Sequence, residues 1–155
     1  MRYQAWILLI LASLYSCSMR NDVEEIKPSD NLVNVGDALP AFVVEMNDGT
    51  RLRSEDLKGK PSLVLLFSTT CPDCQRELPG LNKRYLEHGA DTTFVAISRE
   101  QASADVSAYW EKEGLSLPYS AQPDRYVYSL FAKKGIPRIY ISDLHGIVQR
   151  VETPF

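Results

Sequence analysis

Cys71-Pro72-Asp73-Cys74-Gln75-Arg76-Glu77-Leu78-Pro79 is the stretch that decides the fold of this chain. It closely follows the apolar run of residues 63–67, as expected where a buried strand leads into a helix. Such a junction puts Cys71 at the helix N-terminus, where unpaired backbone amides and the helix dipole favour a thiolate. Cys71 and Cys74 are three residues apart, so they can form a short disulfide and open it again. The stretch therefore predicts redox chemistry.

The length and composition are those of one globular domain. The chain has 155 residues, of which 45% are hydrophobic and 24% are charged. A net charge of -3 argues against a nucleic-acid partner, because proteins that bind nucleic acids are usually basic. Three cysteines are too few for a disulfide scaffold. Two of them form the Cys71 and Cys74 pair, so Cys17 needs its own explanation.

Residues 1–16 have the pattern of an export signal. A positive residue near the start is followed by an apolar block of about ten residues, whereas a transmembrane helix needs about 20. The block ends in Leu14-Tyr15-Ser16-Cys17, which resembles a bacterial lipobox, although its tyrosine is larger than usual. The alternative is an ordinary signal peptide with an incidental cysteine. We predict a signal peptide over residues 1–16, a lipidated Cys17 and a flexible polar tether over residues 17–34.

The remaining chain, residues 35–155, alternates between strand and helix patterns. Strands are expected at residues 42–46, 50–53, 63–67, 94–97, 139–141 and 147–151, and helices from residue 71, over residues 102–113 and from about residue 123. Turn signals at residues 47–49 and 143–146 predict two hairpins. Parallel strands joined by helices, followed by an antiparallel pair, predict a three-layer α/β/α fold with an N-terminal β-hairpin.

Helical spacing predicts which side of the helix after Cys71 is buried. The apolar positions of one face are Cys74, Leu78, Leu81 and Tyr85. Pro79 should kink this helix. Glu77 lies one turn beyond Cys74, at the margin of the buried face. Spacing leaves two readings of Glu77 open, an exposed residue near the positive end of the helix and a partly buried carboxyl group beside the thiols.

Two cysteines at this spacing can also be half of a zinc site, which needs four ligands. Beyond Cys17 the chain has no other cysteine, and its histidines are His88 and His145. Their positions near a helix end and in a turn favour surface residues. We therefore expect no metal and no other cofactor.

Several short motifs extend the redox stretch into a wider pattern. Residues 36–42 fit G-x-x-x-P-x-F, and Asp48-Gly49-Thr50 and Leu57-Lys58-Gly59-Lys60 follow. Residues 71–79 have the form C-x-x-C-x-x-E-x-P. On these motifs, residues 35–151 resemble the TlpA/ResA-like thiol-disulfide oxidoreductases, which are extracytoplasmic members of the thioredoxin fold. The resemblance implies an enzyme with a thioredoxin-like α/β/α sandwich.

The resemblance also assigns roles to particular residues. Cys71 corresponds to the exposed nucleophile and Cys74 to the resolving cysteine. Pro137, in Gly135-Ile136-Pro137-Arg138, corresponds to the cis-proline that faces the disulfide. Glu77 corresponds to a glutamate beside the active site, which favours the partly buried reading and proton exchange with Cys74.

The chain departs from the family pattern in three places. Thr70 stands where an aromatic residue usually precedes the first cysteine, and Leu65 stands where some thioredoxins carry a buried aspartate. The sequence ends without the family's last helix, so we expect one face of the sheet to be partly uncovered. Asp73, between the thiols, either disfavours the thiolate and makes the pair more reducing or is a solvated charge with little effect.

The predicted reaction begins with attack of the Cys71 thiolate on a substrate disulfide, and Cys74 then resolves the mixed disulfide. The resemblance implies exported proteins, such as apocytochromes, as substrates and an upstream membrane electron donor. It also implies a location on the periplasmic side of the bacterial cell envelope, where the predicted lipid anchor would hold the enzyme.

Two other functions remain open. A thiol peroxidase shares the broader fold, with Ser68 three residues before Cys71 and Arg138 as a residue that stabilises the thiolate. Val64, however, occupies the place where the peroxidase motif has proline. A Cu(I)-delivery module would have a wider cysteine spacing and a histidine near the pair. Peroxide consumption would identify the first function and tight Cu(I) binding the second.

Overall fold

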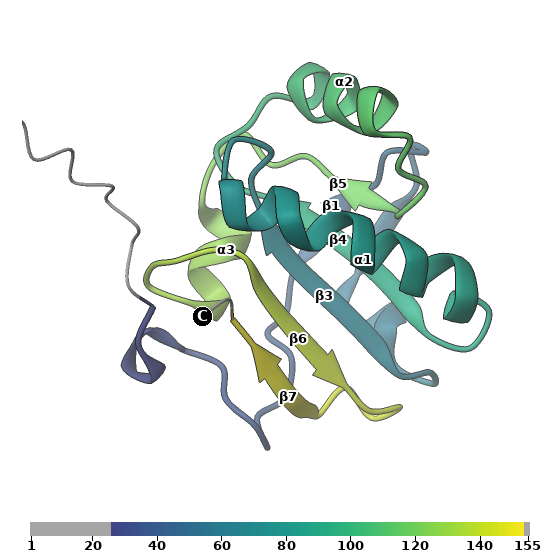
Figure 1. Ribbon diagram of the computed structural model, residues 1–155. Helices are drawn as coiled ribbons and strands as arrows, with labels where there is room; N and C mark the ends of the chain where they lie inside the picture. Colours follow the sequence, from purple (N-terminus) through teal and green to yellow (C-terminus); the bar gives the residue numbers. More distant parts are fainter. Residues whose placement is uncertain (1–25, 154–155) are drawn as a thin grey trace, which may run out of the picture.

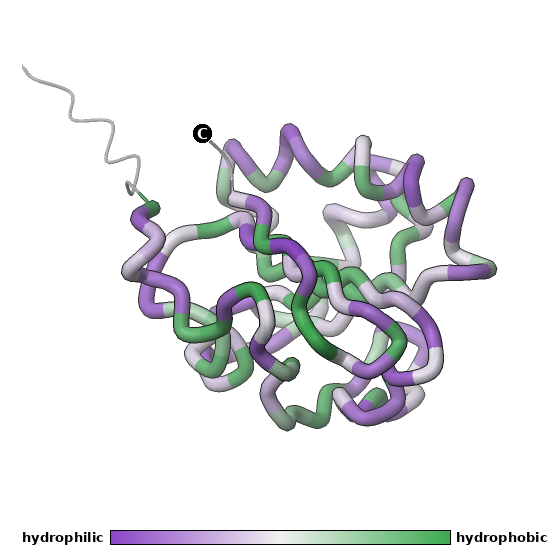
Figure 2. Tube along the Cα trace, turned by 90° about the horizontal axis from the view of Figure 1, so that it is seen from below, coloured by the Kyte–Doolittle hydropathy of each residue, from purple (hydrophilic) through white to green (hydrophobic). Residues whose placement is uncertain are grey.

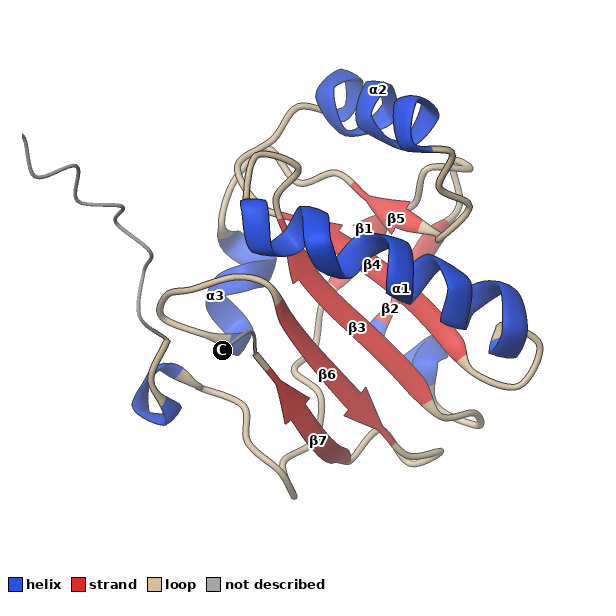
Figure 3. Ribbon diagram, in the orientation of Figure 1, coloured by secondary structure: helices blue, strands red, loops and turns tan. Residues whose placement is uncertain are grey.

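The computed structural model describes residues 26–153, which form a five-stranded mixed sheet with helices on both faces (Figures 1 and 3). The strand order is β5-β4-β3-β6-β7. The strands are β3 (Ser62–Phe67), β4 (Thr93–Ser98), β5 (Tyr119–Ser120), β6 (Arg138–Ser142) and β7 (Val148–Glu152). The helices are α1 (Pro72–His88), α2 (Ser103–Glu113) and α3 (Tyr126–Phe131). β3, β4 and β5 are parallel, whereas β6 and β7 are antiparallel to their neighbours. The parallel pair β3 and β4 and the antiparallel pair β6 and β7 are as predicted.

Strand β3 is central and buried on both faces, which explains its uninterrupted apolar sequence. Leu63, Leu65 and Phe67 pack into the cluster that contains the inner faces of α1 and α2. Val64 and Leu66 pack into the opposite cluster, which contains the inner face of α3. Figure 2 shows hydrophobic residues towards the middle of the molecule and hydrophilic residues on its outer turns. The predicted three layers are therefore confirmed.

The N-terminal hairpin, also predicted, forms a separate two-stranded sheet of β1 (Val43–Glu45) and β2 (Arg51–Arg53). Gly49 has a φ of 81° in its turn, a conformation that glycine adopts without strain. The short 3-10 helix η2 (Ser54–Leu57) follows. Val44 and Leu57 are buried in the cluster beneath α3, so the hairpin and η2 complete that layer.

Helix α1 begins directly after Cys71, as predicted. Cys74, Leu78 and Leu81 are buried against the sheet, and the ring of Tyr85 lies 5.8 Å from that of Phe94. Pro79 lies inside the helix, which continues through it as one element.

The predicted tether is wrong for its last residues, because the folded domain begins before residue 35. The short 3-10 helix η1 (Pro28–Asp30) is followed by a bridge between Asn31 and Ala132, and Val33 is buried in the core. The polar composition of this segment suggested a linker, but its backbone pairs with the residues at the end of α3. The predicted signal peptide over residues 1–16 and the predicted lipidation site Cys17 lie outside the described residues.

Helix α3 and strand β5, both in the C-terminal half of the chain, differ from the prediction. Helix α3 begins at Tyr126, whose N–H donates to Asp124 Oδ1 at 2.8 Å, so Pro123 does not open the helix. Strand β5 was not expected, since two residues carry no periodic pattern. It is held by the Ser120 hydroxyl, which donates to the carbonyl of Glu45 at 2.6 Å.

The α1 side of β7 is polar rather than an exposed apolar face. No helix follows β7 within residues 26–153. Arg150 and Glu152 are two residues apart, so they lie on the same face of the strand, and they form an ion pair at 3.1 Å. Arg84 of α1 lies 3.9 Å from Glu152. These charged groups keep that edge of the sheet compatible with water.

Candidate active site

Cys71 is the N-cap of α1 and combines partial exposure with hydrogen-bond donors. Its Sγ accepts a hydrogen bond from the backbone N–H of Cys74 at 3.3 Å. The Cys74 side chain is the largest influence on the Cys71 thiol, and with the N–H groups of Cys74 and Asp73 it lowers the pKa of Cys71 from 9.0 to about 6. Cys71 is thus suited to act as a nucleophile near neutral pH.

Cys74 lies one turn into the helix and is 1% exposed. Burial in the apolar cluster is the main cause that raises its pKa well above the usual range, and the neighbouring Cys71 acts in the same direction. Both sulfur atoms are free thiols in this structure. The pair is therefore asymmetric, with one reactive thiol at the surface and one protonated thiol behind it.

The loop between α3 and β6 brings a carbonyl group to the nucleophile. The Ile136–Pro137 peptide bond is cis, as predicted. The Cys71 Sγ donates to the carbonyl oxygen of Ile136 at 3.6 Å, so the cis-proline loop lies against the reactive thiol. Pro137 is buried and directly precedes β6.

A glutamine clamp holds the loop that leads into Cys71. The N–H of Thr69 donates to Gln101 Oε1 at 2.8 Å, and Gln101 Nε2 donates to the Thr69 hydroxyl at 2.6 Å. Gln75 Nε2 donates to the Thr69 carbonyl at 2.7 Å. Sequence reasoning missed this clamp, because Gln101 is 32 residues from Thr69 and no motif marks it.

Asp73 has only a small influence on the nucleophile. Its carboxylate forms an ion pair with Arg76, on the exposed side of α1. Its charge raises the pKa of Cys71, but it is the smallest of the influences on that thiol. The geometry favours the reading of Asp73 as a solvated charge with little effect, placed in the first turn of α1.

Glu77 is exposed, so the expected partial burial is wrong. The margin of a helix face is decided by the packing around it, and Leu78 rather than Glu77 occupies the buried side. A role of Glu77 in proton exchange stays a prediction, without burial to support it.

Two positions that depart from the family pattern are also placed by the structure. Leu65 is buried in the core, and Thr70 is exposed beside Cys71, with its hydroxyl 2.9 Å from that of Ser68.

Arg138 lies on the opposite side of the sheet from Cys71. It pairs in register with Leu66, which faces the α3 layer. Its guanidinium donates to the carbonyls of Lys134 and Gly135 and to the side chain of Asn31. This geometry does not support the role of Arg138 in stabilising a peroxidase thiolate.

No group of three or more metal-ligating side chains occurs within residues 26–153. His88 and His145 are exposed, as expected for surface residues. Within the same residues, no helix has the length and apolar character needed to cross a membrane.

Comparison with known proteins agrees with the site. The model of the AhpC/TSA family matches residues 35–151. The thiol-disulfide oxidoreductase ResA of Bacillus subtilis is 26% identical over 148 residues, which cover 95% of this chain and 81% of that protein. The motifs predicted a resemblance to the TlpA/ResA-like thiol-disulfide oxidoreductases, and this similarity to ResA confirms it.

Solved structures show the fold. The thioredoxin domain of a thiol-disulfide oxidoreductase from Bacteroides vulgatus has a TM-score of 0.68 at 23% identity and covers 79% of this chain and 91% of that chain. The exposed lipoprotein thioredoxin Etrx1 of Streptococcus pneumoniae has a TM-score of 0.63 at 22% identity, over 75% of this chain and 90% of that chain. The three-layer fold is thioredoxin-like, as predicted.

Proposed function

We propose, from the premise that this chain belongs to the AhpC/TSA family and is a thiol-disulfide oxidoreductase of the ResA type, that it reduces disulfides of exported proteins. One observation carries the proposal. Cys71 is a partly exposed thiol at a helix N-terminus, its pKa is lowered to about 6, and it lies beside the buried thiol of Cys74. The two thiols supply the two electrons that a disulfide needs.

The first step is attack of the Cys71 thiolate on one sulfur of the substrate disulfide. The substrate S–S bond breaks, a bond forms between Cys71 and the attacked sulfur, and the leaving thiolate takes a proton from water. The mixed disulfide carries no charge on Cys71. Since the neighbouring Cys71 contributes to the raised pKa of Cys74, this loss of charge makes Cys74 easier to deprotonate.

The second step resolves the mixed disulfide. Cys74 gives its proton to water and attacks Cys71 Sγ, the bond between Cys71 and the substrate breaks, and a Cys71–Cys74 disulfide forms. The released substrate thiolate takes a proton from water. The substrate has then gained two electrons and two protons. A membrane-bound dithiol donor upstream would return the enzyme to its reduced form by the same exchange in the opposite direction.

We further propose that the enzyme works on the periplasmic side of the cell envelope, anchored through a lipid on Cys17. The apolar block and the lipobox-like ending of residues 1–17 support this location. A solved structure of similar fold is described as an exposed lipoprotein thioredoxin, which is consistent with the same arrangement.

A thiol peroxidase is the second candidate, because the AhpC/TSA family model is compatible with it as well. The position of Arg138 on the far side of the sheet favours disulfide reduction over this alternative. Consumption of hydrogen peroxide by the reduced protein, at a rate above that of disulfide exchange, would favour the peroxidase.

Trapping tests the proposed reaction. In a Cys74→Ser variant expressed in the native compartment, we expect exported proteins to remain bound to Cys71 as mixed disulfides. A matched Cys71→Ser variant should trap none. The direction of the reaction is measured separately, as the rate at which the reduced protein opens insulin disulfides. If the oxidised protein transfers its disulfide to a reduced substrate faster than this, the enzyme is an oxidase and the reducing role is wrong.

A further inference from the structure

Arg138 holds the loop that faces Cys71 from the other side of the sheet. Its side chain is 0% exposed, and a buried guanidinium needs hydrogen-bond acceptors. Its Nη2 donates to the Lys134 carbonyl at 2.6 Å, and its Nε donates to the Gly135 carbonyl at 3.1 Å. Two carbonyls just before the cis peptide bond are thus fixed by one side chain.

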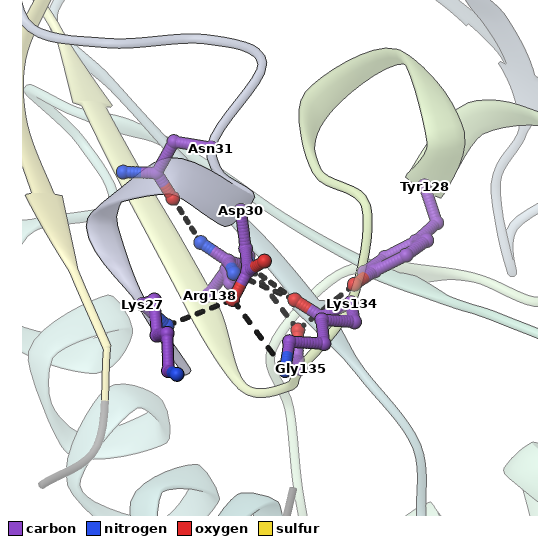
Figure 4. Close-up of polar contacts among 7 residues, drawn as sticks. All are labelled: Lys27, Asp30, Asn31, Tyr128, Lys134, Gly135 and Arg138. Carbon is purple, nitrogen blue, oxygen red and sulfur yellow. Dashed lines mark hydrogen bonds and ion pairs between the residues drawn. The ribbon is translucent and has the colours of Figure 1, made fainter. Parts of the chain in front are cut away.

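The N-terminal segment supplies the third acceptor. The side-chain oxygen of Asn31 accepts a hydrogen bond from Arg138 Nη1 (Figure 4). The N–H of Lys133 donates to the Asp30 carbonyl at 2.9 Å, and the Asp30 carboxylate lies 3.9 Å from Lys134 Nζ. We call residues 26–33 the N-terminal clasp, because they hold this loop through both backbone and side chains.

The clasp also packs closely on the backbone of the loop. Gly135 has a φ of +84°, and a Cβ added there would come within 2.3 Å of Ile26 Cγ1. On the other side of Gly135, the hydroxyl of Tyr128 donates to the Gly135 carbonyl at 3.1 Å. The loop is thus confined between Ile26 and Tyr128.

The next residue of the loop contacts the nucleophile, since the Ile136 carbonyl accepts from Cys71 Sγ. We propose that the N-terminal clasp positions the cis-proline loop against Cys71 through the contact between Asn31 and Arg138, and so tunes the reactivity of the nucleophile. Asn31 and Arg138 act here as positioning residues for thiol–disulfide exchange, because neither touches Cys71.

The effect on Cys71 has a defined sign. The Ile136 carbonyl accepts from the protonated thiol and repels a thiolate, whereas the N–H groups at the helix N-terminus favour the thiolate. A loosened loop would withdraw the carbonyl and admit water, and both changes stabilise the thiolate. Loss of the clasp is therefore expected to lower the pKa of Cys71, by about 0.5 units if part of one hydrogen bond is lost.

The experiment compares four variants of the full chain, of which three concern asparagine residues and the fourth is Ile26→Ala. Asn31→Ala removes the acceptor for Arg138, and Asn31→Asp retains an oxygen there. Asn34→Ala is the matched control, because Asn34 is exposed and its contacts with Asp37 are made by its backbone. The pKa of Cys71 is measured from the pH dependence of its alkylation, read on the Cys71 peptide by mass spectrometry, beside the thermal unfolding midpoint.

We expect Asn31→Ala to lower the pKa of Cys71 by about 0.5 units, with Asn31→Asp and Asn34→Ala close to the wild type. Ile26→Ala, which loosens the clasp by a different contact, should shift the pKa in the same direction. A lower unfolding midpoint with an unchanged pKa in Asn31→Ala would overturn the proposal, as would equal shifts in Asn31→Ala and Asn34→Ala. The titration does not depend on turnover, so a wild type that fails to reduce insulin would contradict the proposed function and leave this inference to be judged on its own readout.

Discussion

Removing the side chain of Cys74 should raise the pKa of Cys71, because that side chain is the largest influence that lowers it. A hydrogen bond to a charged group contributes about 1.5–3 kcal/mol, and one pKa unit corresponds to about 1.4 kcal/mol. In Cys74→Ala, the pKa of Cys71 should therefore rise from about 6 by about 1–2 units. The N–H groups of Cys74 and Asp73 remain and should keep the pKa below 9.0.

Cys74→Ser is the matched control, because its hydroxyl can still donate to Cys71. At pH 7 the wild type and Cys74→Ser should be about 90% thiolate, and Cys74→Ala about 10–50%. The alkylation rate of the Cys71 peptide measures this fraction. For the wild type and Cys74→Ser the rate should fall as the pH decreases through about 6, and for Cys74→Ala it should fall at a higher pH.

Titration curves of the alanine and serine variants that both match the wild type would refute this reasoning. The backbone at the N-terminus of α1, rather than the Cys74 side chain, would then set the pKa of the nucleophile. A pKa that rises in both variants would show that the hydroxyl does not replace the thiol as a donor to Cys71.

Three further predictions concern other residues. Gln101→Leu should lower the free energy of unfolding by about 2 kcal/mol in urea titrations, because two polar atoms of Thr69 lose their partner in a buried site; an unchanged midpoint would contradict the clamp. Glu77→Gln should change the insulin reduction rate less than about twofold, since Glu77 is exposed, and a larger loss in a folded variant would restore its role in proton exchange. Native protein should partition into the detergent phase and Cys17→Ala into the aqueous phase, whereas aqueous partitioning of both would remove the lipid anchor.

Much of the fold was predictable because its signals are local. The apolar run before Cys71 is continuous since β3 is covered on both faces, and the buried positions of α1 follow the helical period. The redox pair could be identified from its spacing, and the cis-proline from a family motif. None of these inferences needed contacts between distant parts of the chain.

The remaining features depend on tertiary contacts that leave no local pattern. Asn31 and Arg138 are 107 residues apart in the sequence, so a polar segment that looked like a tether could not be recognised as part of the domain. Gln101 reaches its partner from the loop after β4. Glu77 lies at the margin of a helix face, where the helical period alone does not decide which of two adjacent residues is buried.

The early start of the folded domain limits how far the active site could lie from a membrane anchor at Cys17. With a lipid on Cys17, Ile26 would follow the anchor by nine residues, and nine peptide units span at most about 30 Å. A free segment up to residue 35 would have allowed about twice that distance. Ile26 packs directly on Gly135, next to the loop that faces Cys71, so the reactive sulfur lies close to Ile26 and hence to the anchored side of the domain. The active site of such an enzyme would reach only a thin layer of the envelope next to the membrane. Its targets would be disulfides presented close to the lipid surface.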